Sequence, residues 1–368
     1  MTQHDNSNAL QQAVAQASQQ RKPLCIQGAG SKKFLGHTEQ CSDSTMLDMR
    51  THSGIVSHEP TELVVTVRSG TPVAELEAVL KEHGQMLAFE PPQHNNDSTI
   101  GGVVACGLSG PRRHVSGSVR DYVLGVRCIN GRGELLSFGG QVMKNVAGYD
   151  VSRLLTGSMG TLAVMLDISF KLLPAPEVES TRVFELTQQQ ALQKMLQLSA
   201  RPLPVTATAY DNGRLYVRVS GMEVAVAAAI SELGGEQADN RWWTALRNQT
   251  LPLFNKDDSR NLWRLSVPAS APLPDIEGES LIDWGGAQYW LRTDEDAAVM
   301  REQAERMGGH ATLYFGDDTD IDVFHPLPKP VMRWHRRLKG AFDPHDILNP
   351  GRMYRDLEPE QVNADAVA

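Results

Sequence analysis

The chain has 368 residues, of which 41% are hydrophobic and 21% charged, a length that exceeds one ordinary core and favours two domains. Its net charge of −9 argues against a general nucleic-acid binder. No stretch approaches about 18 uninterrupted apolar residues, and the N-terminus (MTQHDNSNALQQAVAQ) lacks the basic start and apolar core of a signal peptide, so we expect a cytoplasmic protein without a spanning helix.

Up to Pro176 the sequence predicts short strands and helices joined by glycine-rich loops. Thr71-Pro72 is typical of a helix start, with Thr71 as the cap and Pro72 at the first helical position. Asn130-Gly131 is a strong hairpin signal between two apolar runs. In chain order the predicted elements are a helix at 8–20, strands at 24–27 and 62–67, a helix from 72 to 84, strands at 123–129 and 134–138, a helix at 151–155 and a strand at 162–172.

The stretch Pro174-Ala175-Pro176 marks a boundary, beyond which the sequence pattern changes. It is followed by a predicted helix at 188–200, a hairpin at 207–219, a helix at 222–233, strands near 262–267 and 287–293, and a helix near 294–306. This order favours an antiparallel sheet with helices on one side. We therefore predict an α+β protein with parts at 1–175, 176–327 and 328–368, the last of them returning to the first.

The loop Gly28-Ala29-Gly30-Ser31-Lys32-Lys33 follows the first predicted strand. Glycines allow a tight turn and a close approach of the backbone to a ligand. Consecutive amides in such a turn form an anion nest suited to a pyrophosphate. The third glycine of the dinucleotide-fold fingerprint is missing, and so is the Walker pattern, so an ordinary turn remains an equal alternative for this loop alone.

Two further segments are unusually rich in small residues. Ser98–Gly110 (STIGGVVACGLSG) leaves room for something thin and planar, with close packing of a helix or strand as the alternative. Gly157–Leu162 (GSMGTL) opens a strand from a glycine turn whose backbone can pair with a polar ring edge, with a plain hairpin turn as the alternative.

These pieces, in this order, resemble the vanillyl-alcohol-oxidase/cresol-methylhydroxylase family of FAD-binding proteins. Three more segments carry the resemblance over essentially the whole chain: Arg120–Gly125, Lys144–Asp150 and Phe342–Met353. The resemblance implies a two-part FAD-binding domain with a cap made of an antiparallel sheet plus helices. It also implies FAD, with the pyrophosphate at Gly28, Ala29, Gly30, Ser31 and Lys32, and the rest of the cofactor along Pro92, Gly101, Gly102, Ala105, Gly110, Ser118, Gly160, Thr161, Val164 and Asn349. We expect this FAD to be noncovalent, because family members that tether the flavin commonly place a histidine in the nest loop, whereas His37 lies a few residues beyond it.

The substrate side of the site carries a weaker signal. In family members that oxidise 2-hydroxy acids a general base takes the hydroxyl proton, and histidine suits this role. We name His310 and His335 as catalytic candidates, with His325 as an alternative base. Arg333, with Arg336 and Arg337 near it, can clamp a carboxylate, but an amphipathic helix face with solvated charge is the stronger explanation for this segment. The metal-binding histidine cluster of the hydroxy-acid oxidases is reduced here to one histidine in the run from Gly308 to Tyr314, so no metal site is predicted.

The cysteines Cys25, Cys41, Cys106 and Cys128 show no metal-ligand spacing, so we expect no iron–sulfur cluster in this chain. A flavin chain without cluster ligands must pass its electrons to another protein or a diffusible acceptor. Within the family, the chain resembles the smaller flavin subunits of bacterial glycolate oxidases. This implies a larger flavin subunit and an iron–sulfur subunit as partners, a 2-hydroxy acid such as glycolate or D-lactate as substrate, and membrane association only through the complex.

Two alternatives to a catalytic subunit remain open at this stage. The chain can be a flavin-bearing scaffold or relay that has no substrate site, or a stand-alone oxidase that uses oxygen. Candidate interface patches are Trp242-Trp243, Leu251–Phe254 and Trp263, with burial in the cap core as the alternative for the tryptophans.

Overall fold

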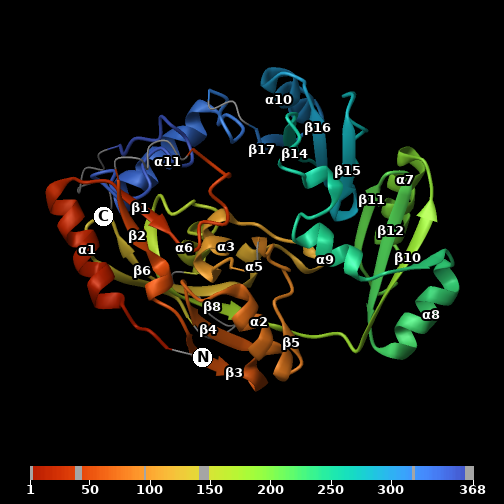
Figure 1. The fold of residues 1–368 in the computed structure, drawn as a ribbon, viewed down its shortest axis with the longest axis horizontal. Helices are drawn as coiled ribbons and strands as arrows, with labels where there is room; N and C mark the ends of the chain where they lie inside the picture. Colours follow the sequence, from red (N-terminus) through yellow and green to blue (C-terminus); the bar gives the residue numbers. More distant parts are fainter. Residues whose placement is uncertain (1–2, 38–43, 95–96, 141–148, 317–319, 361–368) are drawn as a thin grey trace.

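The computed structural model describes residues 3–37, 44–94, 97–140, 149–316 and 320–360, and Figure 1 shows how they are arranged. Cys41 and residues 144–148 of the predicted Lys144–Asp150 run lie outside these ranges. The chain forms two main sheets, one from each side of Pro174-Ala175-Pro176.

The helices are α1 (Ser7–Gln20), α2 (Val73–Glu82), α3 (Ile100–Cys106), α4 (Arg113–Ser116), α5 (Val119–Tyr122), α6 (Tyr149–Leu154), α7 (Gln188–Ser199), α8 (Glu223–Leu233), α9 (Arg241–Arg247), α10 (Ala297–Arg306) and α11 (Lys329–Phe342). The strands are β1 (Leu24–Gln27), β2 (Thr45–Asp48), β3 (Ile55–Glu59), β4 (Val64–Arg68), β5 (Gln85–Met86), β6 (Val123–Asn130), β7 (Leu135–Gly139), β8 (Ala163–Lys171), β9 (Leu173–Pro174), β10 (Val178–Glu185), β11 (Val205–Asp211), β12 (Arg214–Gly221), β13 (Glu236–Ala238), β14 (Asn261–Ser266), β15 (Glu279–Asp283), β16 (Gln288–Thr293) and β17 (His310–Phe315).

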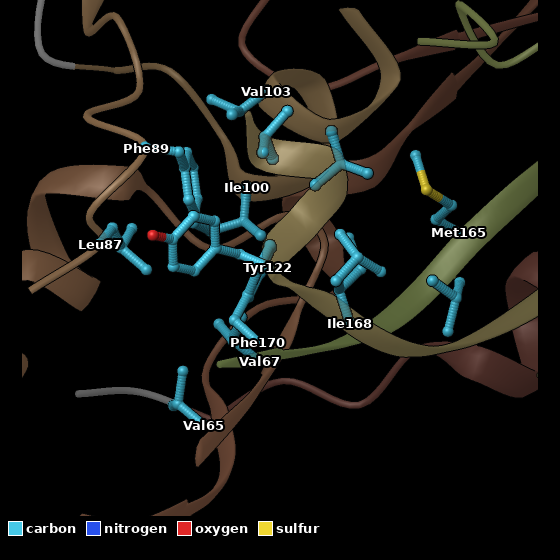
Figure 2. Packing of buried hydrophobic residues seen from close by; sticks show 14 of the residues in the cluster. Val65, Val67, Leu87, Phe89, Ile100, Val103, Tyr122, Met165, Ile168 and Phe170 are labelled. Atoms are coloured by element: carbon cyan, nitrogen blue, oxygen red, sulfur yellow. The ribbon is translucent and has the colours of Figure 1, made fainter. Parts of the chain in front are cut away.

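The first sheet has, within the described residues, five antiparallel strands in the order β3-β4-β8-β6-β7. All residues of β4 are buried, because α2 and α3 cover one face of the sheet while α1 and the C-terminal segment cover the other. Figure 2 shows the packing on the first of these faces, where Phe89 lies between Tyr122 and Phe170, with ring centroids 5.6 and 5.7 Å away. This double coverage explains why the strands are continuous apolar runs.

Strand β1 does not join this sheet; instead it pairs in parallel with β2. Its other edge meets the end of the chain, where Leu24 forms an isolated bridge with Leu348. Leu10 and Val14 of α1 pack with Ile347 and Leu348 in one buried cluster. The first and last described segments of the chain therefore support each other.

The second sheet has eight described strands in the order β13-β10-β12-β11-β15-β16-β14-β17, and every pair within it is antiparallel. Helices α7, α8 and α10 pack on its outer face (Figure 1). Its inner face packs on α9 and on Leu35, Leu108 and Met159 from the first part of the chain. The predicted α+β class, with helices against an antiparallel sheet in the second part, is confirmed.

Some local predictions are wrong. Thr71 does not cap α2, since Pro72 occupies the cap position and the Thr71 hydroxyl accepts a hydrogen bond from the Gly54 amide at 2.9 Å. The small residues after Thr99 form a helix, α3, which the glycine content concealed. For Trp243 and Trp263 the alternative of burial in the core of the second part is correct, since 2% and 0% of their surface is exposed.

Candidate functional site

The loop after β1 contacts the start of α3. Gly30 has φ +75°, a left-handed conformation that glycine adopts without strain. A Cβ on Gly28 would lie 2.1 Å from the Thr99 hydroxyl oxygen, so no larger residue fits at this crossing. The hydrogen bonds found within the described residues leave the amides of Ala29, Gly30, Ser31 and Lys32 without a protein acceptor. This is the expected state of an anion nest.

Helix α3 presents small side chains along one side. Its cap is Thr99, whose hydroxyl accepts from the Gly102 amide. A Cβ on Gly101 would lie 2.7 Å from the Ser69 Cβ, so glycine allows the helix to approach the turn after β4. One turn later, Ala105 and Cys106 follow on the same side. The small-residue spacing therefore makes one wall of a cavity.

The cavity has a volume of about 390 Å³ and lies between the nest loop, α3, the start of β8 and the C-terminal segment. Of the predicted cofactor-binding residues, those that line it are Gly28, Ala29, Gly30, Ser31, Lys32, Gly101, Gly102, Ala105, Gly160 and Asn349. The remaining lining residues are Cys25, Ile26, Gln27, Lys33, Ser44, Met46, Met49, Ser69, Thr99, Cys106, Met159, Ala163, Met165 and Arg352.

The cavity suits an anionic nucleotide with a flat ring. Among its described lining residues the charged ones are Lys32, Lys33 and Arg352, all cationic. Burial lowers the pKa of Lys32, and its ammonium donates to the Ser98 hydroxyl at 2.8 Å. The Arg352 guanidinium donates to the backbone carbonyls of Lys32 and Lys33, both at 3.3 Å, which leaves the amide side of the loop available for a ligand. Four methionines supply apolar surface that adapts to a planar ring.

The C-terminal segment closes the cavity. The Asn349 side-chain oxygen accepts from the Ile26 amide at 2.7 Å, and its amide nitrogen donates to the Met159 carbonyl at 2.8 Å. A Cβ on Gly160 would come within 2.7 Å of that nitrogen, so the turn needs glycine there. The buried Lys339 ammonium donates to the Thr161 carbonyl at 2.9 Å and to Asp343 at 2.8 Å.

Several predicted residues lie away from the lining. Val164 points into the core under α1, and the Thr161 hydroxyl donates to the Ser158 carbonyl within its own turn. A Cβ on Gly110 would lie 2.4 Å from the Glu90 carbonyl oxygen, so this glycine serves packing. Ser118 forms a capping box with Asp121 at the start of α5. Pro92 is buried but does not line the cavity.

The helix that carries two of the catalytic candidates does not line the cavity. Arg333 on α11 is exposed and lies 3.8 Å from a Glu360 carboxylate oxygen. His335, on the same helix, is hydrogen-bonded to the Val331 carbonyl at 3.0 Å. His325 is paired with Glu305 at 3.1 Å. His37, the weak candidate for covalent attachment, is buried with its ring 3.5 Å from Asp322.

Arg264, a cationic residue that the sequence analysis did not identify as a site residue, lies where the two parts of the chain meet. Arg264 on β14 pairs with Thr312 of β17. Tyr314 and His310 lie two residues to either side of Thr312 on β17, so both share the inner face of the sheet with Arg264. Its Nε is buried without a hydrogen-bond partner among the described residues. Burial lowers the pKa of Arg264, and the charges acting on it are those of Tyr314, Arg113 and Cys106, with no carboxylate among them. A charged residue within the apolar strand Leu262–Leu265 was the available signal.

Comparisons with known proteins agree with this geometry. Residues 3–139 match the family model described as an FAD binding domain. The chain is 46% identical to the glycolate oxidase subunit GlcE of Escherichia coli, over 96% of this chain and 99% of that protein. It is 28% identical to the glycolate oxidase subunit GlcD of Bacillus subtilis, over 98% of this chain and 90% of that one. A D-lactate dehydrogenase of Anaerostipes hadrus matches at 27% identity over 45% of this chain and 34% of its own length.

Among solved structures, alkyldihydroxyacetonephosphate synthase superposes with a TM-score of 0.64 at 16% identity, covering 94% of this chain and 76% of that one. At this identity the likeness concerns the fold. Within the described residues no helix is both long and apolar enough to cross a membrane. The described residues also contain no group of three or more His, Cys, Asp or Glu side chains that could hold a metal ion.

Proposed function

Because this chain belongs to the GlcE-type glycolate oxidase subunits, within the FAD-binding family of the vanillyl-alcohol-oxidase type, we propose that it takes part in oxidising glycolate or a similar 2-hydroxy acid such as D-lactate to the 2-oxo acid. Its cofactor is FAD, and it is a subunit of an FAD-dependent oxidoreductase. Bound FAD supplies an acceptor for two electrons.

The observation that carries the proposal is the row of unpaired amides from Ala29 to Lys32 at one end of a cavity with cationic charges. In the proposed arrangement these amides hold the pyrophosphate, and Lys32 adds a buried positive charge beside them. Asn349 fixes the turn at Met159, so that the backbone beyond it meets the polar edge of the ring. No side chain in this arrangement forms a covalent bond to the cofactor.

The substrate carboxylate is assigned to Arg264, supported by Arg113. Arg264 is half-buried, and its buried Nε without a partner is an electrostatic cost that an incoming acid would offset. Arg113 extends over the Trp284 ring at 4.1 Å, and its charge acts on Arg264 across the seam between the two parts. Arg264 takes the role that the sequence suggested for Arg333, which is paired at the surface.

His310 remains the candidate for the base. The ring is exposed at the start of β17, and partial desolvation together with the charges of Arg264, His325 and Arg113 lowers its pKa, so His310 is neutral and able to accept a proton near pH 7. In this step the hydroxyl proton of the acid moves to the His310 ring, and the C2 hydrogen with its two electrons would be taken up by bound FAD, which gives the 2-oxo acid. Electrons then pass to the larger flavin subunit and the iron–sulfur subunit, which we propose as partners.

The test is anaerobic addition of glycolate to the purified chain, followed by the same addition to the chain assembled with its partner subunits. Bleaching of the flavin absorbance in the isolated chain supports direct catalysis. Absence of bleaching in the assembled complex contradicts the proposed function.

A second candidate, a flavin relay without its own substrate site, is favoured by one observation. The lining of the cavity, as far as the described residues form it, contains no histidine. Bleaching that depends on the partners, and that survives replacement of Arg264 and His310 in this chain, supports the relay.

A further inference from the structure

Helix α11 has one side that the fold uses and one that it leaves exposed. Lys339 and Gly340 are buried, and Leu338 and Phe342 pack against the core of the first sheet. A Cβ on Gly340 would lie 2.0 Å from the Glu360 carbonyl oxygen, so the final described segment runs along a second flank of the helix.

The first half of the helix exposes an aromatic residue. Trp334 is 62% exposed and Val331, one turn before it, is 40% exposed. The Arg337 guanidinium lies over the Trp334 ring at 5.1 Å, one turn further along the helix. Tryptophan and arginine in such a stacked arrangement are the residue types that dominate binding energy in protein interfaces.

The charge of this helix is opposite to that of the whole chain. Its sequence, KPVMRWHRRLKGAF, contains five lysines and arginines and no acidic residue, whereas the chain carries a net charge of −9. Three of the five are near carboxylates: Arg333 with Glu360, Arg336 with Asp356, and Lys339 with Asp343. No carboxylate of the described residues is found within ion-pair distance of Arg337, so its charge lies beside the exposed Trp334 ring without an acidic partner.

We propose that the face formed by Val331, Trp334 and Arg337, here called the α11 face, is the docking site for an acidic surface of a partner subunit, with Trp334 inserting into an apolar socket. The inference rests on the proposed function in one respect, that this chain works as a subunit. A second copy of this chain is a poor occupant, because two molecules with the same net negative charge repel each other. A membrane is also a poor occupant, because two exposed apolar side chains give far less buried area than an interfacial helix needs.

The chain contains an internal comparison. Met222 and Val224 at the start of α8 are more exposed, at 67% and 83%, but have no aromatic residue and are separated by the acidic Glu223. If exposed apolar area alone attracted the partner, α8 would be the stronger site. If the partner requires an aromatic residue beside a positive charge, α11 would be the stronger site.

The experiment is co-expression of the chain with a GlcD-type subunit and an iron–sulfur subunit from the same organism, followed by affinity capture through a tag on this chain. Trp334→Ala and Arg337→Glu are compared with the double variant Met222→Ala/Val224→Ala. We expect the first two to weaken partner binding at least tenfold while bound FAD per chain stays unchanged, and the α8 variant to bind like the wild type.

Three outcomes overturn the inference. The first is that both α11 variants assemble as well as the wild type. The second is that the wild-type chain captures neither subunit. The third is that the wild-type chain floats with anionic phosphatidylglycerol vesicles and the α11 variants do not, while these variants still assemble. If the complex assembles through α11 but glycolate does not reduce its flavin, the docking face is supported and the proposed function is contradicted. The two failures are therefore distinguishable.

Discussion

Asn349 and Met159 lie 190 residues apart in sequence, yet the Asn349 amide nitrogen donates to the Met159 carbonyl at 2.8 Å. The same side chain accepts from the Ile26 amide. One buried amide therefore joins the strand before the nest loop, the glycine turn before β8 and the C-terminal segment, which are three walls of one cavity.

Asn349→Ala should loosen all three walls. It leaves the Ile26 amide and the Met159 carbonyl without their partner, at a cost of about 1–3 kcal/mol for each buried group. We expect a lower melting temperature and at least tenfold weaker FAD binding, measured by flavin content after dialysis. Asn8→Ala on the exposed side of α1 is the control and should change neither quantity. Full flavin retention by Asn349→Ala would separate this residue from the cofactor site.

Gly30→Asp should abolish FAD binding, because a carboxylate would face the pyrophosphate at contact distance. Gly30→Asn is the matched control, since it introduces the same shape without the charge, and asparagine tolerates the positive φ better than most residues. We expect the asparagine variant to keep part of its flavin. Equal loss in both variants would assign the effect to backbone strain rather than to an anion at the nest.

Arg264→Met should raise the KM for glycolate in the assembled complex by roughly 10–100-fold, the value of a charge-assisted hydrogen bond of about 1.5–3 kcal/mol. Arg264→Lys should recover only part of this, because the planar fork is lost. Arg333→Ala, at the surface, should leave KM unchanged. The reverse result, an effect at Arg333 and none at Arg264, would restore the assignment suggested by the sequence.

Lys339→Met should destabilise the chain by about 3–5 kcal/mol, the cost of leaving a buried carboxylate without its partner. Asp343, the carboxylate in question, is completely buried. The free energy of unfolding in urea measures the effect. Lys329→Met, at the exposed start of the same helix, should change it by less than about 0.5 kcal/mol.

Asp283 should make stability depend on pH. Burial raises the pKa of this carboxyl from its ordinary value of 3.8 to about 7, with a further contribution from Glu90. The folded chain thus holds a proton that the unfolded chain releases, and stability from this group is lost as pH rises from about 4 to about 7. Asp283→Asn keeps an oxygen acceptor for the Trp284 amide, so its melting temperature relative to the wild type should be higher at pH 8 than at pH 5. A constant difference would show that Asp283 ionises normally.

The sequence predicted the parts of the fold that depend on local signals. The hairpin at Asn130-Gly131, the helices of the second part and the nest loop follow from turn residues and apolar spacing, and the structure contains them. Gly28, Gly101 and Gly160 could be named in advance because a glycine requirement is visible in the chain itself.

Other parts depend on contacts between distant segments and left no local signal. Arg333 and Arg264 are both arginines among apolar residues, but only the pairing of β14 with β17 reveals which of them lies on the inner face of a sheet. Gly110 and Val164 lie in motifs typical of the family. Both are directed away from the cavity, Gly110 because it packs against Glu90 and Val164 because it packs in the core under α1. Helix α3 formed despite two glycines because Ile100, Val103 and Val104 bury one side of it.

The cavity takes its walls from residues 25 to 33 and from residues 349 and 352. A ribosome delivers residues 25 to 33 well before residues 349 and 352. The pocket is therefore incomplete until both segments have been synthesised and have met, so a complete cavity for the cofactor cannot guide the earliest folding of the chain.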